Sequence, residues 1–170
     1  LREEALATSP SPTVAEPPAP SASVTAVNTP VTPTTATASA VPAFRWRVAR
    51  VSAAQLGASW HRGCPVGPSS LRRVTVSYWD FAGHPRTGVL VLNAGVVADT
   101  RAAFAALYRM RFPFRSIRPV SDFGASDDAS MAADNTSAFN CRPVASSNPP
   151  RWSAHAFGHA IDVNTIENPY

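Results

Sequence analysis

The stretch of residues 74–92 reads VTVSYWDFAGHPRTGVLVL and carries the clearest structural pattern in the chain. Apolar side chains alternate with Thr and Ser at its start, which is typical of a strand with one buried face. Residues 80–85 include Asp, Gly and Pro, which favour a turn, and an apolar run follows from Gly88 to Leu92. The pattern therefore predicts an antiparallel β-hairpin.

The residues after the hairpin predict one helix and several further strands. Ala98 to Met110 is rich in helix formers, and Phe112-Pro113 ends this segment because Pro cannot donate a backbone hydrogen bond. A polar loop is expected over residues 124–135. Strands are expected at residues 117–123, 138–142 and 160–164. This order predicts an α+β fold with a small, mostly antiparallel sheet and flanking helices.

The composition divides the chain into two parts. Pro, Ala, Ser and Thr make up 30 of the first 42 residues, and this part has no aromatic residue. Such a segment has too little apolar mass to offset the entropy of ordering, so residues 1–42 are expected to form a disordered tether or an inert terminus. Residues 43–170 hold every aromatic residue, His and Cys, and are expected to form one domain.

The distribution of charged and apolar residues argues against a nucleic-acid partner and against a membrane-spanning segment. The chain has a net charge of +4, all of its basic residues are Arg, and no more than two Arg stand in succession. Nucleic-acid binders cluster their basic residues, so no nucleic-acid partner is expected. No apolar run approaches the roughly 18 residues of a membrane span, so no transmembrane segment is expected. We expect a monomer.

Residues 153–162 hold the side chains best suited to chemistry. A bend at Gly158 could fold His155 back towards Asp162, and an imidazole with a carboxylate suits a zinc ion. The alternative is an Asp bound to backbone next to an ordinary polar His. A second alternative pairs His155 with His159 on a helix, but Ala156 stands where a zincin motif needs its Glu.

The pattern Ser-x-His-x-x-Gly-x-Ala-x-Asp, present as residues 153–162, resembles the zinc signature of the VanY-like D-alanyl-D-alanine carboxypeptidases. The likeness covers about residues 45–170. It includes short blocks at residues 63–66, 112–113, 134–142 and 168–170. It implies a fold of the hedgehog/D-Ala-D-Ala-peptidase type. It also implies a zinc-dependent peptidase that hydrolyses peptidoglycan stem peptides, as a carboxypeptidase or an endopeptidase.

The resemblance implies a role for each matched residue. His155 and Asp162 would be zinc ligands, Ser153 would help to orient them, and Arg142 would hold the substrate carboxylate or the charge developing at the scissile carbonyl. The family's third ligand is a His in an Asp-x-x-His or Glu-x-x-His segment, which also supplies the general base. No such segment follows Asp162, so we expect either a chain cut before it or a degenerate homologue. The 170 residues alone are expected to be inactive.

The resemblance also implies where the protein works. The closest likeness is to secreted members, so a secreted or cell-envelope-anchored protein is expected. Cys64 and Cys141 could form a disulfide in such a protein, and two free buried thiols are the alternative. A non-catalytic cell-wall-binding or protein-interaction module of the same fold is the competing function.

Overall fold

The computed structural model describes residues 41–144 and 146–169, which belong to one compact unit. The tether expected over residues 1–42 lies outside the described residues, except for its last two positions. Among the described residues, no helix is both long and apolar enough to cross a membrane.

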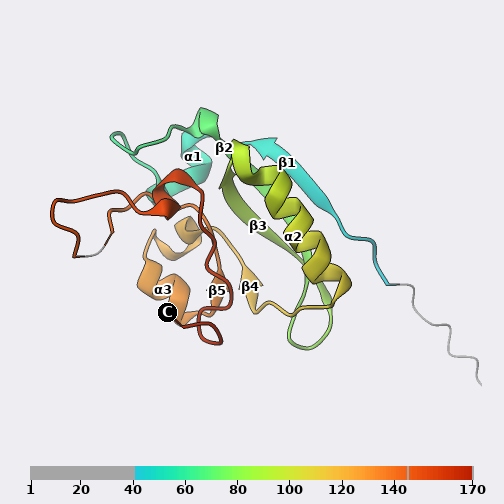
Figure 1. Ribbon diagram of the computed structural model, residues 1–170. Coiled ribbons are helices and arrows are strands. Elements are labelled where there is room, and N and C mark those ends of the chain that lie inside the picture. The colour runs from blue at the N-terminus through green and yellow to red at the C-terminus, as the bar shows by residue number, and fades with distance from the viewer. Residues whose placement is uncertain (1–40, 145, 170) are drawn as a thin grey trace, which may run out of the picture. The chain divides into compact units, whose positions relative to one another are not determined.

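A three-stranded antiparallel sheet in the order β1-β2-β3 forms the centre of the domain (Figure 1). Its strands are β1 (Trp46–Arg50), β2 (Leu71–Trp79) and β3 (Pro85–Asn93). The predicted hairpin is confirmed as β2 and β3, in which Val74 pairs with Leu90. Strand β1 was not predicted, because its sequence, Trp-Arg-Val-Ala-Arg, has no regular alternation and this edge strand is mostly exposed.

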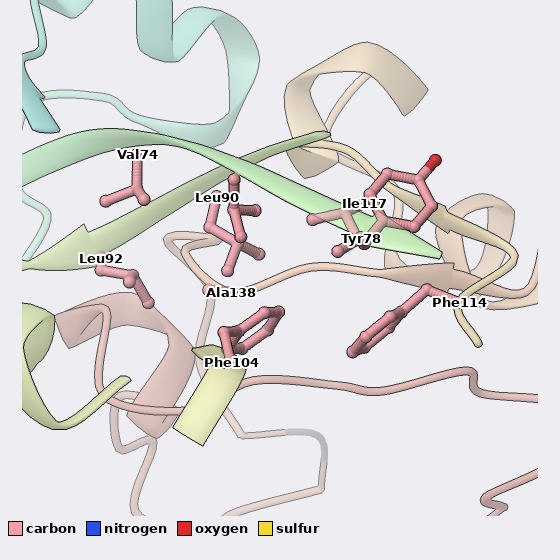
Figure 2. Packing of buried hydrophobic residues seen from close by; sticks show 9 residues of the cluster. Val74, Tyr78, Leu90, Leu92, Phe104, Phe114, Ile117 and Ala138 are labelled. Carbon is pink, nitrogen blue, oxygen red and sulfur yellow. The ribbon is translucent and has the colours of Figure 1, made fainter. Parts of the chain in front are cut away.

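The main core lies between one face of the sheet and helix α2 (Val97–Arg109), which crosses the sheet in Figure 1. Figure 2 shows Phe104 of α2 among side chains of β2 and β3, and the Phe104 and Phe114 rings stack with centroids 5.5 Å apart. Burying such a side chain stabilises the fold by about 1.5–3 kcal/mol. The predicted helix and its buried stripe at Phe104 and Tyr108 are confirmed.

A second, smaller cluster lies on the other face of the sheet, because successive side chains of a strand point to opposite faces. Helix α1 (Ala53–Leu56) contributes to it. The buried members of this cluster are Val51, Leu56, Leu71, Val91 and Phe139. The sheet is therefore covered on both faces, and Phe139 brings the C-terminal part of the chain onto it.

Two predictions for residues 117–135 are wrong in detail. The expected strand over residues 117–123 is short, β4 (Ser116–Ile117), and a 3-10 helix, η4 (Val120–Phe123), follows it. Pro119 and the left-handed Gly124 bound this helix. The expected polar loop contains helix α3 (Asp127–Ala132), whose first turn is capped by the Ser126 hydroxyl. Strand β4 pairs in parallel with β5 (Asn135–Thr136), apart from the antiparallel sheet.

The segment of residues 134–144 and 146–169, here called the strap, is mostly irregular and is drawn in orange to red in Figure 1. The strands expected at 138–142 and 160–164 are not formed, and isolated bridges such as Ser137 to Asp162 stand in place of ladders. Polar side chains hold the strap instead. The buried Asn164 accepts a hydrogen bond from Arg115 N–H (3.3 Å) and donates to the carbonyl of Pro113 (2.9 Å).

Candidate functional site

The candidate site begins at a one-turn 3-10 helix, η5 (Ala154–Phe157). The Ser153 hydroxyl caps it by accepting a hydrogen bond from the backbone N–H of His155 (3.3 Å). Gly158 ends it in the left-handed conformation, with φ +72°. The helix therefore stops before His159, so the helical pairing of His155 with His159 is not formed, and the His159 ring stacks on Phe157.

The bend at Gly158 is fixed against the end of strand β3. The Gly158 carbonyl accepts a hydrogen bond from Asn93 N–H (3.0 Å), and the Asn93 amide donates to the Phe157 carbonyl (3.0 Å). A Cβ atom on Gly158 would lie 2.7 Å from Asn93 N. Only glycine combines this positive φ with so close an approach of two backbones. The bend expected from the sequence is therefore present, and it docks on the sheet.

Residues 137 and 138 bring the two predicted ligands together. Asp162 and Ser137 exchange backbone hydrogen bonds of 2.9 and 3.1 Å. The His155 ring donates from Nδ1 to the Ala138 carbonyl (2.6 Å), since a carbonyl can only accept. As a result, His155 Nε2 lies 3.4 Å from Asp162 Oδ1.

The electrostatics of this pair follow from its contacts. The hydrogen bond to Asp162 raises the pKa of His155 above its ordinary value of 6.5, and burial and the charge of Arg142 oppose this effect. The side chains of His155 and Asp162 are 14% and 26% exposed, so a small ligand can reach both. A metal ion at Nε2 would have to displace the proton that Asp162 favours there.

The pair fits two positions of a zinc site. Metal-ligating histidines commonly donate their second ring N–H to a carbonyl, as His155 does to Ala138. At zinc–ligand distances of roughly 2.0–2.1 Å, tetrahedral ligand atoms lie about 3.4 Å apart. The observed separation of Nε2 and Oδ1 is also 3.4 Å. Within residues 41–144 and 146–169, no third His, Cys, Asp or Glu joins the two.

Arg142 lies beside the pair and is held in an ion pair by Asp127, the first residue of α3. The Asn140 amide donates to the other Asp127 oxygen (2.7 Å). The Arg142 carbonyl accepts from Ser153 N–H (3.1 Å), so the Arg142 block lies against the start of η5. This network fixes a guanidinium whose charge partly opposes the rise in the pKa of His155 that Asp162 causes.

Sequence reasoning missed Asp127 and Asn140, the two partners that fix Arg142. Asp127 belongs to residues 124–135, which were expected to be a polar loop, and several acidic residues there are equivalent by composition. Nothing in the spacing distinguishes Asp127 from Asp128. Only the start of α3 at Asp127 turns that carboxylate towards Arg142.

A hollow of about 300 Å³ is lined by Pro143, which follows Arg142, and by Pro150, Arg151 and Trp152, which precede Ser153. A short antiparallel bridge joins two of these residues, Pro143 and Trp152, immediately before the Ser153 cap. Trp152 is 38% exposed, which is high for so large an apolar ring. The hollow therefore offers a partly apolar surface on the segments that adjoin Arg142 and Ser153 in the chain.

Cys64 and Cys141 form a disulfide, so the alternative of two free thiols is wrong. The bond joins the loop after α1 to the strap, across a sequence separation of 77 residues. His61 lies beside it, with Nε2 3.7 Å from Cys141 Sγ. A structural disulfide is characteristic of an oxidising compartment.

No family model, curated protein or solved structure matches the chain. The grounds for a function are therefore the pattern at residues 153–162 and the contacts described above. The fold alone is compatible with many activities.

Proposed function

We propose that this chain carries the metal-binding part of a zinc-dependent peptidase that hydrolyses peptidoglycan stem-peptide bonds. The main support is that His155 Nε2 lies 3.4 Å from Asp162 Oδ1 while His155 Nδ1 donates to the Ala138 carbonyl. These residues are the His and Asp of the pattern that resembles the VanY-like zinc signature. We likewise assign the α+β domain to the hedgehog/D-Ala-D-Ala-peptidase type.

Each site residue has a physical role in this proposal. His155 and Asp162 would hold the zinc ion, and Ser153 fixes the backbone of His155 through the η5 cap. When bound, zinc supplies a Lewis acid for the scissile carbonyl and lowers the pKa of its bound water. Arg142, fixed by Asp127, would hold the carboxylate of the peptide or the charge that develops at the carbonyl.

The proposal also requires a third ligand and a general base. The resemblance implies that both come from an Asp-x-x-His or Glu-x-x-His segment, and residues 163–170 contain no His. Two ligands alone hold zinc weakly compared with the three protein ligands of catalytic sites. The 170 residues are therefore expected to bind zinc weakly and to release little or no product.

The surroundings of the site support a peptide substrate outside the cytoplasm. The apolar hollow at Trp152 would contact the peptide or the adjoining sugar, because exposed aromatic rings bind such groups by stacking and burial. The Cys64–Cys141 disulfide favours a secreted or envelope-anchored protein that acts on the cell wall.

A second candidate is a non-catalytic cell-wall-binding or protein-interaction module. The observation that favours it is the lack of a third ligand beside His155 and Asp162 among the residues that the structure describes. In this case the Arg142 network and the hollow at Trp152 would bind a ligand without cleaving it.

Zinc titration of the oxidised protein tests the proposed ligands. His155→Ala and Asp162→Asn are expected to weaken zinc binding at least about tenfold, because each removes one of only two ligands. His84→Ala is the matched control, since His84 is an exposed histidine in the β2–β3 turn and should leave the affinity unchanged. Zinc binding that is equal in all four proteins would overturn the site.

Hydrolysis by the full-length protein separates the two functions. Zinc-loaded protein is incubated with a peptide that ends in D-Ala-D-Ala and with cross-linked stem peptides, and release of D-Ala or of the cleaved peptides is measured. Product that disappears in His155→Ala supports the peptidase. Binding of the peptides without any product supports the non-catalytic module.

A further inference from the structure

The disulfide and its neighbouring histidine form a second cluster of potential metal ligands, which includes neither His155 nor Asp162. We propose that reduction of the Cys64–Cys141 disulfide creates a zinc site made of both thiolates and His61 Nε2. His Nε2 and the two sulfurs already lie within 4.8 Å of one another. This inference is independent of the proposed peptidase function.

The distances suit a zinc ion once the sulfur–sulfur bond is broken. Zinc binds His nitrogen at roughly 2.0–2.1 Å and Cys sulfur at roughly 2.3 Å, so a tetrahedral N–S ligand pair lies about 3.6 Å apart. His61 Nε2 lies 3.7 Å from Cys141 Sγ. The two sulfurs need to separate to about 3.8 Å by the same reasoning, which rotation of the two side chains can provide.

His61 is already oriented as a ligand. Its Nδ1 donates to the Arg62 carbonyl (2.9 Å), so Nε2 carries the lone pair that faces Cys141. A disulfide sulfur has no proton to donate to this lone pair. Fixing the second ring nitrogen on a carbonyl is the arrangement that supports zinc-ligating histidines elsewhere in proteins.

The loop between His61 and Cys64 resembles a chelating turn. The Cys64 N–H bonds to the His61 carbonyl (3.3 Å), and the His61 N–H donates to Cys64 Sγ (3.2 Å). Gly63 permits the turn with φ +98°. The two-residue spacing equals that of the ligand pairs in many structural zinc sites. A backbone N–H on sulfur stabilises a thiolate because it favours the charged form.

The other arm of the site is fixed by backbone contacts that do not depend on the disulfide. Cys141 N–H donates to the Ser59 carbonyl (3.0 Å), and the neighbouring Asn140 N–H donates to the His155 carbonyl (3.2 Å). The Cα atoms of Cys64 and Cys141 lie 5.9 Å apart. The loop that carries Cys64 is held independently by the hydrogen bond from the Trp60 ring N–H to the Val66 carbonyl (3.0 Å), so reduction leaves both ligand-bearing segments anchored.

A dithiol is the reductant that opens the Cys64–Cys141 disulfide. The dithiol gives two electrons and two protons to the disulfide, becomes a cyclic disulfide itself, and leaves Cys64 and Cys141 as thiols. Zinc binding then releases the two thiol protons to solvent, because the thiolates are the ligands. The disulfide and the zinc ion are thus alternative cross-links at one position, and the redox state selects between them.

Cobalt substitution tests the site because a thiolate–cobalt bond gives a charge-transfer band in the near ultraviolet. The chain is reduced with a phosphine, which becomes a phosphine oxide by taking oxygen from water and adds no thiol that could bind cobalt. The reduced chain is then titrated with Co²⁺ followed by Zn²⁺. The reduced protein is expected to bind one equivalent with this band, and Zn²⁺ is expected to abolish the band. The oxidised protein should show no band, whatever binds at His155 and Asp162.

Variants identify the ligands. His61→Ala should weaken Co²⁺ binding at least about tenfold, whereas the exposed His84→Ala should leave it unchanged. The double substitution Cys64→Ser, Cys141→Ser should remove the band, with far-ultraviolet circular dichroism as the check that it is folded. Absence of the band in reduced protein, or equal affinity in His61→Ala, would overturn the proposal. Equal affinity in denaturing urea would also overturn it, because the site would then not depend on the fold.

Discussion

The sheet with helix α2 (residues 46–109) and the strap (residues 134–144 and 146–169) are built by different interactions. The sheet half has regular ladders and an apolar core that includes Val74, Leu90 and Phe104. The strap has few regular elements and is fixed by hydrogen bonds of buried polar residues such as Asn164. The candidate site lies in the strap, where Gly158 docks on β3. An irregular segment can thus present chemistry when a rigid sheet holds its bend.

The largest effect is expected from removing a core ring of the sheet half. Phe104 is 4% exposed and stacks on Phe114. Phe104→Ala should lower the free energy of unfolding by about 3–5 kcal/mol, because it leaves a cavity. Urea denaturation measures this change. Phe81→Ala is the control, since Phe81 is 44% exposed and its loss should cost about 1 kcal/mol or less. Equal losses for the two rings would contradict the assigned core.

The next effect concerns the covalent link between the regions. Replacing Cys64 and Cys141 by Ser should lower the free energy of unfolding by about 4 kcal/mol, from the entropy of a long closed loop. Thermal unfolding and amide hydrogen exchange measure it. Exchange should increase in the strap more than in β2 and β3, because the sheet keeps its own ladder. Uniform acceleration would show that the regions unfold as one unit.

A polar anchor of the strap should matter somewhat less. Asn164→Ala leaves the Pro113 carbonyl and the Arg115 N–H without their partner. The expected loss is about 2–3 kcal/mol, since unpaired buried groups keep their desolvation penalty. Asn168→Ala removes hydrogen bonds to the Val163 and Asn164 carbonyls that are exposed or only partly buried, and should cost about 1 kcal/mol or less. A strap stabilised by apolar contacts instead would tolerate both changes equally in urea denaturation.

The junction between the regions depends on one glycine. Gly158→Ala combines a positive φ with a Cβ 2.7 Å from Asn93 N, and should destabilise by about 2 kcal/mol. It should also weaken zinc binding, because His155 and Asp162 lie on either side of the bend. Gly83→Ala is the matched control, since its φ is +75° but no atom lies within 4 Å of the added Cβ. Its cost should be about 1 kcal/mol, with zinc binding unchanged.

The smallest effect is expected from the carboxylate of Asp80, in the turn between β2 and β3. Hydrogen bonds from the His84 backbone and the Arg86 side chain lower the pKa of Asp80 below its ordinary value of 3.8. The ionised Asp80 therefore stabilises the fold above pH 3.8, and this stabilisation is lost as the pH falls through the lowered pKa of Asp80 in the folded protein. Melting temperatures of wild type and Asp80→Asn should converge over this acidic range. A constant difference between them would exclude the ionised Asp80 as the cause.

The sheet half was largely predictable because its signals are local. Alternation in Val74–Trp79, the turn residues from Asp80 to Pro85 and the helical stripe of Phe104 and Tyr108 each lie within a few residues. The structure of the strap could not be predicted in the same way, since its hydrogen bonds join residues far apart in the chain, such as Asn164 with Pro113. The segments at 138–142 and 160–164 have strand-like sequences, but no neighbouring strand completes a ladder with them.

The sequence by itself determined the hairpin, the helix and the compositional boundary near residue 42, and it singled out His155 and Asp162 as candidate ligands that a bend at Gly158 could unite. Tertiary structure alone decided that Ala138 fixes the His155 ring and that Asp127 holds Arg142. It also decided that Cys64 and Cys141 are bonded, with His61 beside them. The physical reason is that periodicity and turn chemistry act between neighbours, whereas hydrogen bonds and ligand distances depend on where distant segments pack.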